Sequence, residues 1–110
     1  MTATQISVGI LMGSSSDLPV MRAAGQVLED LSIGHEMRIM SAHRTPDVVD
    51  DYVASAPDRG VEILICAAGM AAHLAGAVAG RTQLPVIGVP LGASLGGMDA
   101  LLATVQMPPG

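Results

Sequence analysis

The sequence predicts an α/β domain with a parallel sheet, in which residues 1–110 form one unit, and three observations support this. Four apolar runs alternate with four helix-like segments through short connections, which is typical of parallel sheets with right-handed crossovers. Hydrophobic residues make up 50% of the chain, enough for one core, whereas 110 residues are too few for two. With no Phe or Trp and 13 glycines, that core must use small aliphatic side chains, which suit close packing of helices on strands.

The first strand and helix are expected near the start of the chain. Residues 5–12 (QISVGILM) are almost continuously apolar and rich in β-branched side chains, as in a strand that is covered on both faces. Residues 17–31 then place apolar side chains at helical spacing. Ser16 or Asp17 is the expected N-cap of this helix, and Pro19 is compatible with its first turn.

The second strand has a different pattern from the first. Residues 35–40 (HEMRIM) alternate polar and apolar side chains, which indicates an edge strand with one face in water. Thr45 is expected to cap the helix that follows, with Pro46 at its first position. This helix is predicted to run to about residue 59, where Gly60 ends it.

Two further strand–helix pairs complete the predicted sheet. The strands are expected at residues 61–68 (VEILICAA) and 84–91 (LPVIGVPL), and the helices at residues 70–82 and 97–107. The lone cysteine, Cys66, lies inside the first of these strands and is interpreted as a small buried hydrophobic residue. A single cysteine cannot form an internal disulfide or a cysteine-based metal site.

Composition excludes several classes of function. The chain has no Lys, so Schiff-base catalysis, pyridoxal phosphate attachment and lysine-based phosphate loops have no residue to use. Its net charge of −5, without a basic cluster or an aromatic platform, argues against nucleic acid as a partner. No apolar run reaches transmembrane length, and no basic segment precedes the first one. We therefore expect no signal peptide, no membrane contact and a cytoplasmic location.

Three loops carry most of the polar chemistry: residues 13–17 (GSSSD), 41–46 (SAHRTP) and 68–73 (AGMAAH). Ligands of open α/β sheets bind beyond the carboxyl ends of the strands, so we expect these loops to lie together at one edge. The first loop leads into a helix N-terminus, which favours an anion, although its serines could equally serve only as helix caps. Asp17 would repel a phosphate and is better suited to ribose hydroxyls.

The second loop combines a proton-transfer group with an anion-binding group. Histidine has an ordinary pKa of about 6.5, so His43 is suited to acid–base work. Arg44 carries a planar fork that matches a phosphate, and Ser41 adds a hydroxyl. The alternative is a solvated polar turn. In the third loop Gly69 and its neighbours offer mainly backbone donors, and His73 is equally suited to a structural hydrogen bond and to a role in the site.

Several ligand classes do not fit these loops. A phospho-acceptor domain needs an Asp at the end of the third strand, where this chain has ICAAG, and a flavin site usually needs aromatic faces, of which Tyr52 is the only source. The GSSSDL segment does not match the dinucleotide fingerprint. His43, His73 and Asp17 lack the spacing of metal ligands, so no metal is expected. Cofactor-free acid–base chemistry on a small phosphorylated molecule remains.

The chain resembles the PurE family from Ile6 to Gly110, because the motifs MGSSSD, SAHRTP, AAHLAG, LPVIGVP and ATVQMPPG occur in that family's order and spacing. The motifs are most similar to the bacterial class, the N5-carboxyaminoimidazole ribonucleotide mutases of de novo purine (IMP) biosynthesis. The resemblance implies a flavodoxin-like three-layer α/β/α fold and a homo-octamer with sites at subunit contacts. It also implies an isomerase without metal or organic cofactor, in which CO2 leaves the exocyclic nitrogen of a ribonucleotide and is re-added at ring carbon four.

The resemblance also implies a role for each candidate residue. The implied site comprises His43, Ser14, Asp17, Arg44, Ser41, Gly69 and His73. The histidine of SAHRTP would be the general acid and base. The two residues of the first loop and the arginine would hold the ribose phosphate. The serine of SAHRTP and the backbone of the third loop would line a CO2 pocket, with the second histidine nearby.

The chain departs from the family pattern in two ways. Met70 and Ala75 stand where many relatives have Gly and Pro. Relatives also continue beyond the QMPPG motif into a fifth strand and a long helix, so we expect this chain to lack the C-terminal strand and helix and to expose residues 84–91 as an apolar edge. Two alternatives to the mutase stay open: direct CO2 carboxylation of aminoimidazole ribonucleotide, and an inactive nucleotide-binding fragment.

Overall fold

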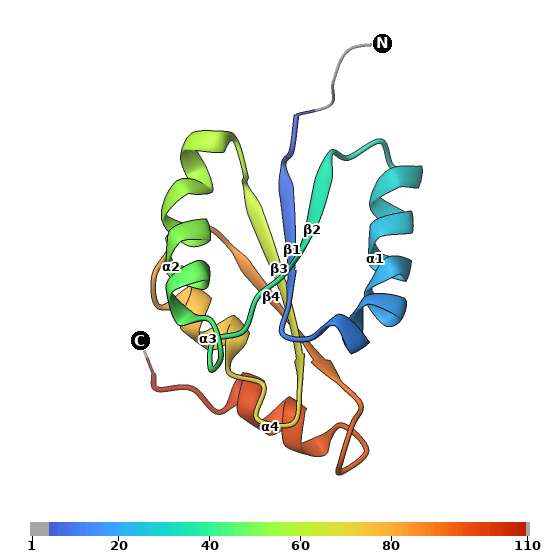
Figure 1. Cartoon of the computed structure of the whole chain (residues 1–110), viewed down its shortest axis with the longest axis vertical. Coiled ribbons are helices and arrows are strands. Elements are labelled where there is room, and N and C mark those ends of the chain that lie inside the picture. Colours follow the sequence, from blue (N-terminus) through green and yellow to red (C-terminus); the bar gives the residue numbers. More distant parts are fainter. Residues whose placement is uncertain (1–4, 110) are drawn as a thin grey trace.

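The computed structural model describes residues 5–109 and is built around a four-stranded sheet in the order β2-β1-β3-β4 (Figure 1). All three strand pairings are parallel. The strands are β1 Val8–Met12, β2 His35–Ile39, β3 Ile63–Gly69 and β4 Val86–Leu91. The predicted parallel α/β fold is confirmed, and so is the edge position of the second strand. Within the described residues β4 forms the other edge.

Helices cover both faces of this sheet, and Figure 1 shows α1 and α2 on opposite sides of it. The helices are α1 Leu18–Asp30, α2 Pro46–Ser55, α3 Leu74–Ala79 and α4 Met98–Val105. The helix α4 packs on β4, where the Thr104 methyl group leaves no room for a side chain at Gly88. Within residues 5–109, none of these helices has both the length and the apolar character that crossing a membrane requires.

The core consists of two clusters, one on each side of the sheet, because strand side chains alternate between its faces. On the α1 side, Val8, Ile10 and Met12 pack with Met21. On the other side, Leu11, Leu64 and Cys66 pack with buried side chains of α2 and α3. All five residues of β1 are buried, as predicted for a strand covered on both faces. Burial raises the pKa of the Cys66 thiol to about 12, so this cysteine is a packing residue at neutral pH.

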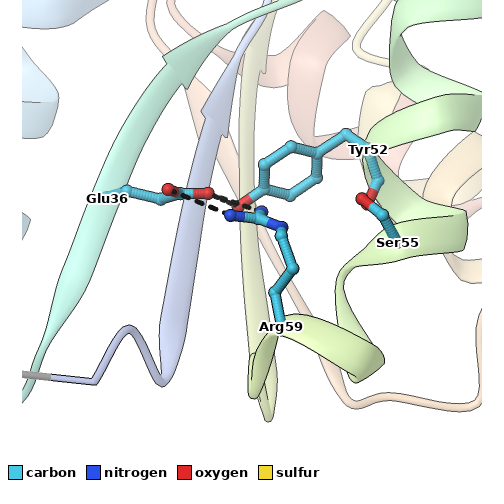
Figure 2. A network of polar contacts seen from close by, with 4 residues as sticks. All are labelled: Glu36, Tyr52, Ser55 and Arg59. Atoms are coloured by element: carbon cyan, nitrogen blue, oxygen red, sulfur yellow. Dashed lines mark hydrogen bonds and ion pairs between the residues drawn. The ribbon is translucent and has the colours of Figure 1, made fainter.

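A polar network joins α2 to the edge strand β2 across the middle of the sheet (Figure 2). The Tyr52 hydroxyl donates to Glu36 Oε2 at 2.6 Å, and Arg59 Nη2 donates to the same oxygen at 2.8 Å. The Tyr52 hydroxyl passes directly over Gly9 of β1, where a Cβ atom would collide with it. A glycine in the middle of a buried strand is thus explained by a side chain that must cross it.

The starts of α1 and α2 lie where the sequence predicts them, but the expected cap bonds are not made. Asp17 holds the predicted N-cap position of α1. Ser14 is the residue whose Oγ makes a cap bond, because it accepts from the Ser16 N–H at 3.3 Å. It caps a 3₁₀ turn over Ser15–Asp17 that precedes α1, and Asp17 makes no side-chain cap bond. Thr45 holds the N-cap position of α2 but likewise makes no cap bond. The Thr45 hydroxyl is instead hydrogen-bonded to the backbone N–H and carbonyl of Ser41, the first residue of the SAHRTP loop.

Two predicted helices are shorter in the structure. The helix predicted to reach about residue 59 ends at Ser55, and a separate 3₁₀ turn, Pro57–Arg59, leads to Gly60 at φ 91°. The helix predicted over residues 70–82 begins only at Leu74. Met70 has φ 55°, in the left-handed region, which interrupts helical geometry before α3.

Candidate functional site

A cavity of about 500 Å³ lies beyond the carboxyl ends of β1, β2 and β3. The register explains why the loops meet there: Met12 of β1 is paired with Ile39 of β2 and with Ala67 of β3, so the three strands end nearly level. All seven candidate residues line this cavity, namely Ser14, Asp17, Ser41, His43, Arg44, Gly69 and His73. The structure therefore brings together every residue that the sequence singled out.

The second loop is held in shape by Ser41. Its Oγ accepts the backbone N–H groups of His43 at 3.2 Å and Arg44 at 3.1 Å. The Thr45 hydroxyl accepts from the Ser41 N–H at 2.8 Å and donates to the Ser41 carbonyl at 3.2 Å. These bonds fix the backbone from which the imidazole and the guanidinium project. The Ser41 hydroxyl keeps its own proton available for a ligand in the cavity.

Arg44 ties the first loop to the second. Its Nη2 donates to the Gly13 carbonyl at 2.9 Å, which places the guanidinium beside the serine loop. Ser14 Oγ and Ser16 Oγ lie 2.9 Å apart in that loop. A guanidinium carries five N–H donors, so one bond to a carbonyl leaves a fork for an anion. Arg44 and Asp17 both line the cavity, which therefore carries one positive and one negative side chain.

The two histidines of the site are in direct contact. His43 Nε2 and His73 Nδ1 lie 2.7 Å apart, within hydrogen-bond distance, and the rings meet edge to face at 83° with centroids 4.8 Å apart. The sequence placed His73 only near the site. The bond joins residues 30 positions apart, so no local spacing could have predicted it.

Two further residues, Ala93 and Met70, also line the cavity. Ala93, from the loop after β4, lines the cavity and was missed because that loop carries no chemically distinctive side chain. A Cβ atom at Gly69 would lie 3.3 Å from the Ala93 Cβ, so glycine fits this narrow wall best. Met70 also lines the cavity and is 58% exposed, whereas Ala75 is buried in the core. Of the two departures from the family pattern, only Met70 lies in the site.

Within residues 5–109, no group of three or more His, Cys, Asp or Glu side chains is arranged to hold a metal ion. The side chains of the cavity offer several kinds of chemistry of their own. It has an imidazole pair for proton transfer, a guanidinium fork for an anion, hydroxyls for polar contacts and a carboxylate for sugar hydroxyls.

Comparison with known proteins gives consistent results. The AIR carboxylase family model matches residues 7–110. The N5-carboxyaminoimidazole ribonucleotide mutase of Pyrococcus abyssi is 55% identical over 104 residues, which cover 94% of this chain and 60% of that protein. The mutase of the same name from Thermotoga maritima is 56% identical over 104 residues, with coverage of 94% and 61%. The crystal structure of Treponema denticola PurE superposes with a TM-score of 0.84 at 34% identity, over 94% of this chain and 66% of that one. The chain thus spans about three fifths of the length of these curated relatives.

Proposed function

The chain belongs to the PurE (AIR carboxylase) family, and from this premise we propose that it acts as an N5-carboxyaminoimidazole ribonucleotide mutase in purine biosynthesis. The product would be 4-carboxy-5-aminoimidazole ribonucleotide. The observation that carries the proposal is the single cavity in which His43 and Arg44 face the serine loop. That cavity offers a proton-transfer group and an anion site to one small ligand.

The proposed binding mode follows from the charges of the cavity. The ribose phosphate is bound by Arg44, by Ser14 and by the backbone N–H groups at the start of the first helical segment. Asp17 accepts from the ribose hydroxyls, since a carboxylate would repel the phosphate. No metal or organic cofactor takes part in this proposal.

The proposed chemistry has two steps that balance within the site. The bond between the exocyclic nitrogen and the carboxylate carbon breaks, and its electron pair returns to the nitrogen. The nitrogen takes up a proton from His43, and CO2 is released. Ring carbon four then forms a bond to CO2 and loses its proton to His43. Because His43 gives a proton in one step and takes one in the other, it is the general acid and base.

The cavity wall supports retention of CO2 between the two steps. Ser41, Gly69 and the alanines beside it form a narrow surface with few charged groups. A carboxylate there has less hydration than in water, which favours its loss as CO2. A CO2 molecule held against ring carbon four reacts as though at very high concentration, with effective molarities on the order of 10⁵–10⁸ M for well-oriented groups.

Direct carboxylation of aminoimidazole ribonucleotide is the second candidate, and the description of the matching family as AIR carboxylase favours it. The two candidates differ in substrate. We propose the mutase because the curated relatives of highest identity described above are named mutases. A cytoplasmic homo-octamer with its sites at subunit contacts remains part of the same proposal.

A substrate competition separates the candidates. The purified chain is mixed with both ribonucleotides at low bicarbonate, and each is followed by chromatography. The mutase consumes the N5-carboxylated ribonucleotide and leaves the unmodified one. Consumption of the unmodified ribonucleotide in proportion to added bicarbonate would replace the mutase with the carboxylase. Binding of both without conversion would instead support a nucleotide-binding fragment.

A further inference from the structure

One residue of the cavity wall has a backbone conformation that disfavours its own side chain. Met70 has φ 55°, in the left-handed region, where a Cβ atom is strained and glycine is not. Among residues 5–109, Ser32 is the only other non-glycine residue at positive φ, and it does not line the cavity. Strain of this kind is concentrated at functional sites, where the surrounding structure holds it in place.

Packing within the chain does not explain why a methionine stands there. Met70 is 58% exposed and packs in neither core cluster of the described chain. Its neighbours from Ala67 to Ala72 are alanines and one glycine, so no side chain longer than a methyl group flanks it in the loop. The turn is made by the backbone, in which the Ala72 N–H donates to the Met70 carbonyl at 2.9 Å. Glycine would make this turn without strain, so the thioether serves something other than the fold.

The composition of the cavity wall indicates what the thioether contacts. The other lining residues are small or polar, except for Leu74, which is 2% exposed and packed in the core. Among the described residues, Met70 is therefore the one long apolar side chain of this wall that a ligand can reach. An unbranched thioether adapts its shape and makes favourable contacts with aromatic rings. The ligand proposed above carries such a ring, an imidazole.

We propose that Met70 binds the face of the ligand's imidazole ring, and that the chain retains the strained backbone for this contact; this inference rests on the mutase function proposed above. The ribose and phosphate are bound by polar groups of the other two loops, so the third loop supplies the contact with the ring. The contact buries an exposed apolar side chain and excludes water from one face of the ring. Met70 is thus a specificity-determining residue that distinguishes the ribonucleotide from its sugar phosphate.

The first test measures binding by calorimetry with the 4-carboxy ribonucleotide and with ribose 5-phosphate, which lacks the ring. In Met70→Ala we expect the Kd of the ribonucleotide to rise about 3–10-fold, the range for a lost sulfur–aromatic contact, and that of ribose 5-phosphate to stay unchanged. Met70→Leu keeps an apolar group of similar size and should bind the ribonucleotide more tightly than Met70→Ala. Equal changes for both ligands, or no change for either, would overturn the inference and leave the proposed function standing. A wild-type chain that binds neither ligand would overturn the proposed function as well.

The second test measures the strain through stability. Met70→Gly and Met70→Ala both remove the thioether, but only alanine keeps a Cβ atom at φ 55°. We therefore expect Met70→Gly to unfold at a higher urea concentration than Met70→Ala, while both bind the ribonucleotide weakly. Ser32→Gly and Ser32→Ala are the matched controls, because Ser32 has φ 57° and does not line the cavity. They should show the same order of stability with wild-type affinity. A Met70→Gly variant no more stable than Met70→Ala would mean that no strain is retained there, and the inference would be wrong.

Discussion

At the scale of single residues, the account depends on two neighbours in one loop with separate tasks. In the proposed reaction His43 moves a proton, and Arg44 binds the phosphate. The backbone bonds to Ser41 Oγ hold both in place, at 3.2 Å and 3.1 Å. Because the tasks are separate, substitutions at the two positions should alter different measured quantities.

His43→Asn should separate chemistry from binding. Asparagine keeps a polar group of similar reach but cannot act as an acid or a base near neutral pH. We expect turnover to fall by about 10²–10⁴-fold, the usual contribution of a general acid–base group, while calorimetry shows nucleotide affinity close to that of the wild type. A variant that retains its turnover would exclude His43 from the mechanism.

Arg44→Ala should weaken binding of the ribonucleotide more than binding of its dephosphorylated nucleoside. In the proposed binding mode the guanidinium pairs with the phosphate, and a charge-assisted bond of this kind contributes about 1.5–3 kcal/mol. Arg22→Ala is the matched control, because Arg22 is an exposed arginine of α1 that does not line the cavity. Equal weakening of both ligands by Arg44→Ala would mean that Arg44 does not bind the phosphate.

At the scale of elements, the sequence was most informative where apolar runs decide the structure. All four strands and four helices were located from such runs, because burial of a continuous apolar segment leaves little choice of element. The ends were less accurate. The Thr45 hydroxyl bonds to Ser41 instead of capping α2, and the left-handed Met70 delays the start of α3.

The contacts between elements could not be predicted. The His43–His73 bond and the Tyr52–Glu36 bond join residues 30 and 16 positions apart, and each depends on strand order and register. The three site loops were predictable as a group, because carboxyl ends of parallel strands share one edge. The pairing of side chains across that edge required the structure.

The Tyr52 network gives a prediction about packing between α2 and β1. In Gly9→Ala the new methyl group collides with the Tyr52 hydroxyl, so we expect a loss of about 1–3 kcal/mol in the free energy of unfolding. The same substitution in a Tyr52→Phe background should cost less, because the hydroxyl is gone. Urea unfolding of the four proteins measures this coupling, and equal costs in both backgrounds would contradict it.

The same network predicts a pH dependence. Burial and the bond to Glu36 raise the pKa of Tyr52 from 10.0 to about 12. The unfolded chain therefore ionises first, and the stability contributed by the neutral hydroxyl is lost as the pH rises from about 10 towards 12. Tyr52 is the only tyrosine, so its phenolate absorbance reports this one group. A folded-state midpoint near 10 would contradict the prediction, and Tyr52→Phe should lack this part of the pH dependence.

At the acid end of the pH range, stability is lost when Glu36 becomes protonated, whereas at the alkaline end it is lost when Tyr52 ionises. The hydrogen bond from Arg59 is the largest cause that holds the pKa of the Glu36 carboxyl below its ordinary value of 4.5. Its contribution to stability is present above that value and is lost as the pH falls through the lower folded-state pKa. The contact between Tyr52 of α2 and Glu36 of β2 is thus weakened at low pH, where Glu36 is protonated, and at high pH, where Tyr52 ionises.

At the scale of the whole molecule, strand order turns dispersed residues into one site. Because β1 and β3 are adjacent and β2 pairs with the other side of β1, the loops after all three strands surround one cavity. The proposed reaction requires that this cavity hold CO2, since CO2 released in the first step must remain for the second. Retention of CO2 is the central claim.

The most direct measurement follows the carboxylate carbon itself. N5-carboxyaminoimidazole ribonucleotide labelled with 13C in its carbamate is converted by the chain in a large excess of unlabelled bicarbonate, with carbonic anhydrase present to equilibrate free CO2. Retention in one cavity predicts that the 4-carboxy product keeps the 13C label, as read by mass spectrometry. A product that carries mainly unlabelled carbon would show that CO2 escapes before it is re-added, and the account of this cavity would be wrong.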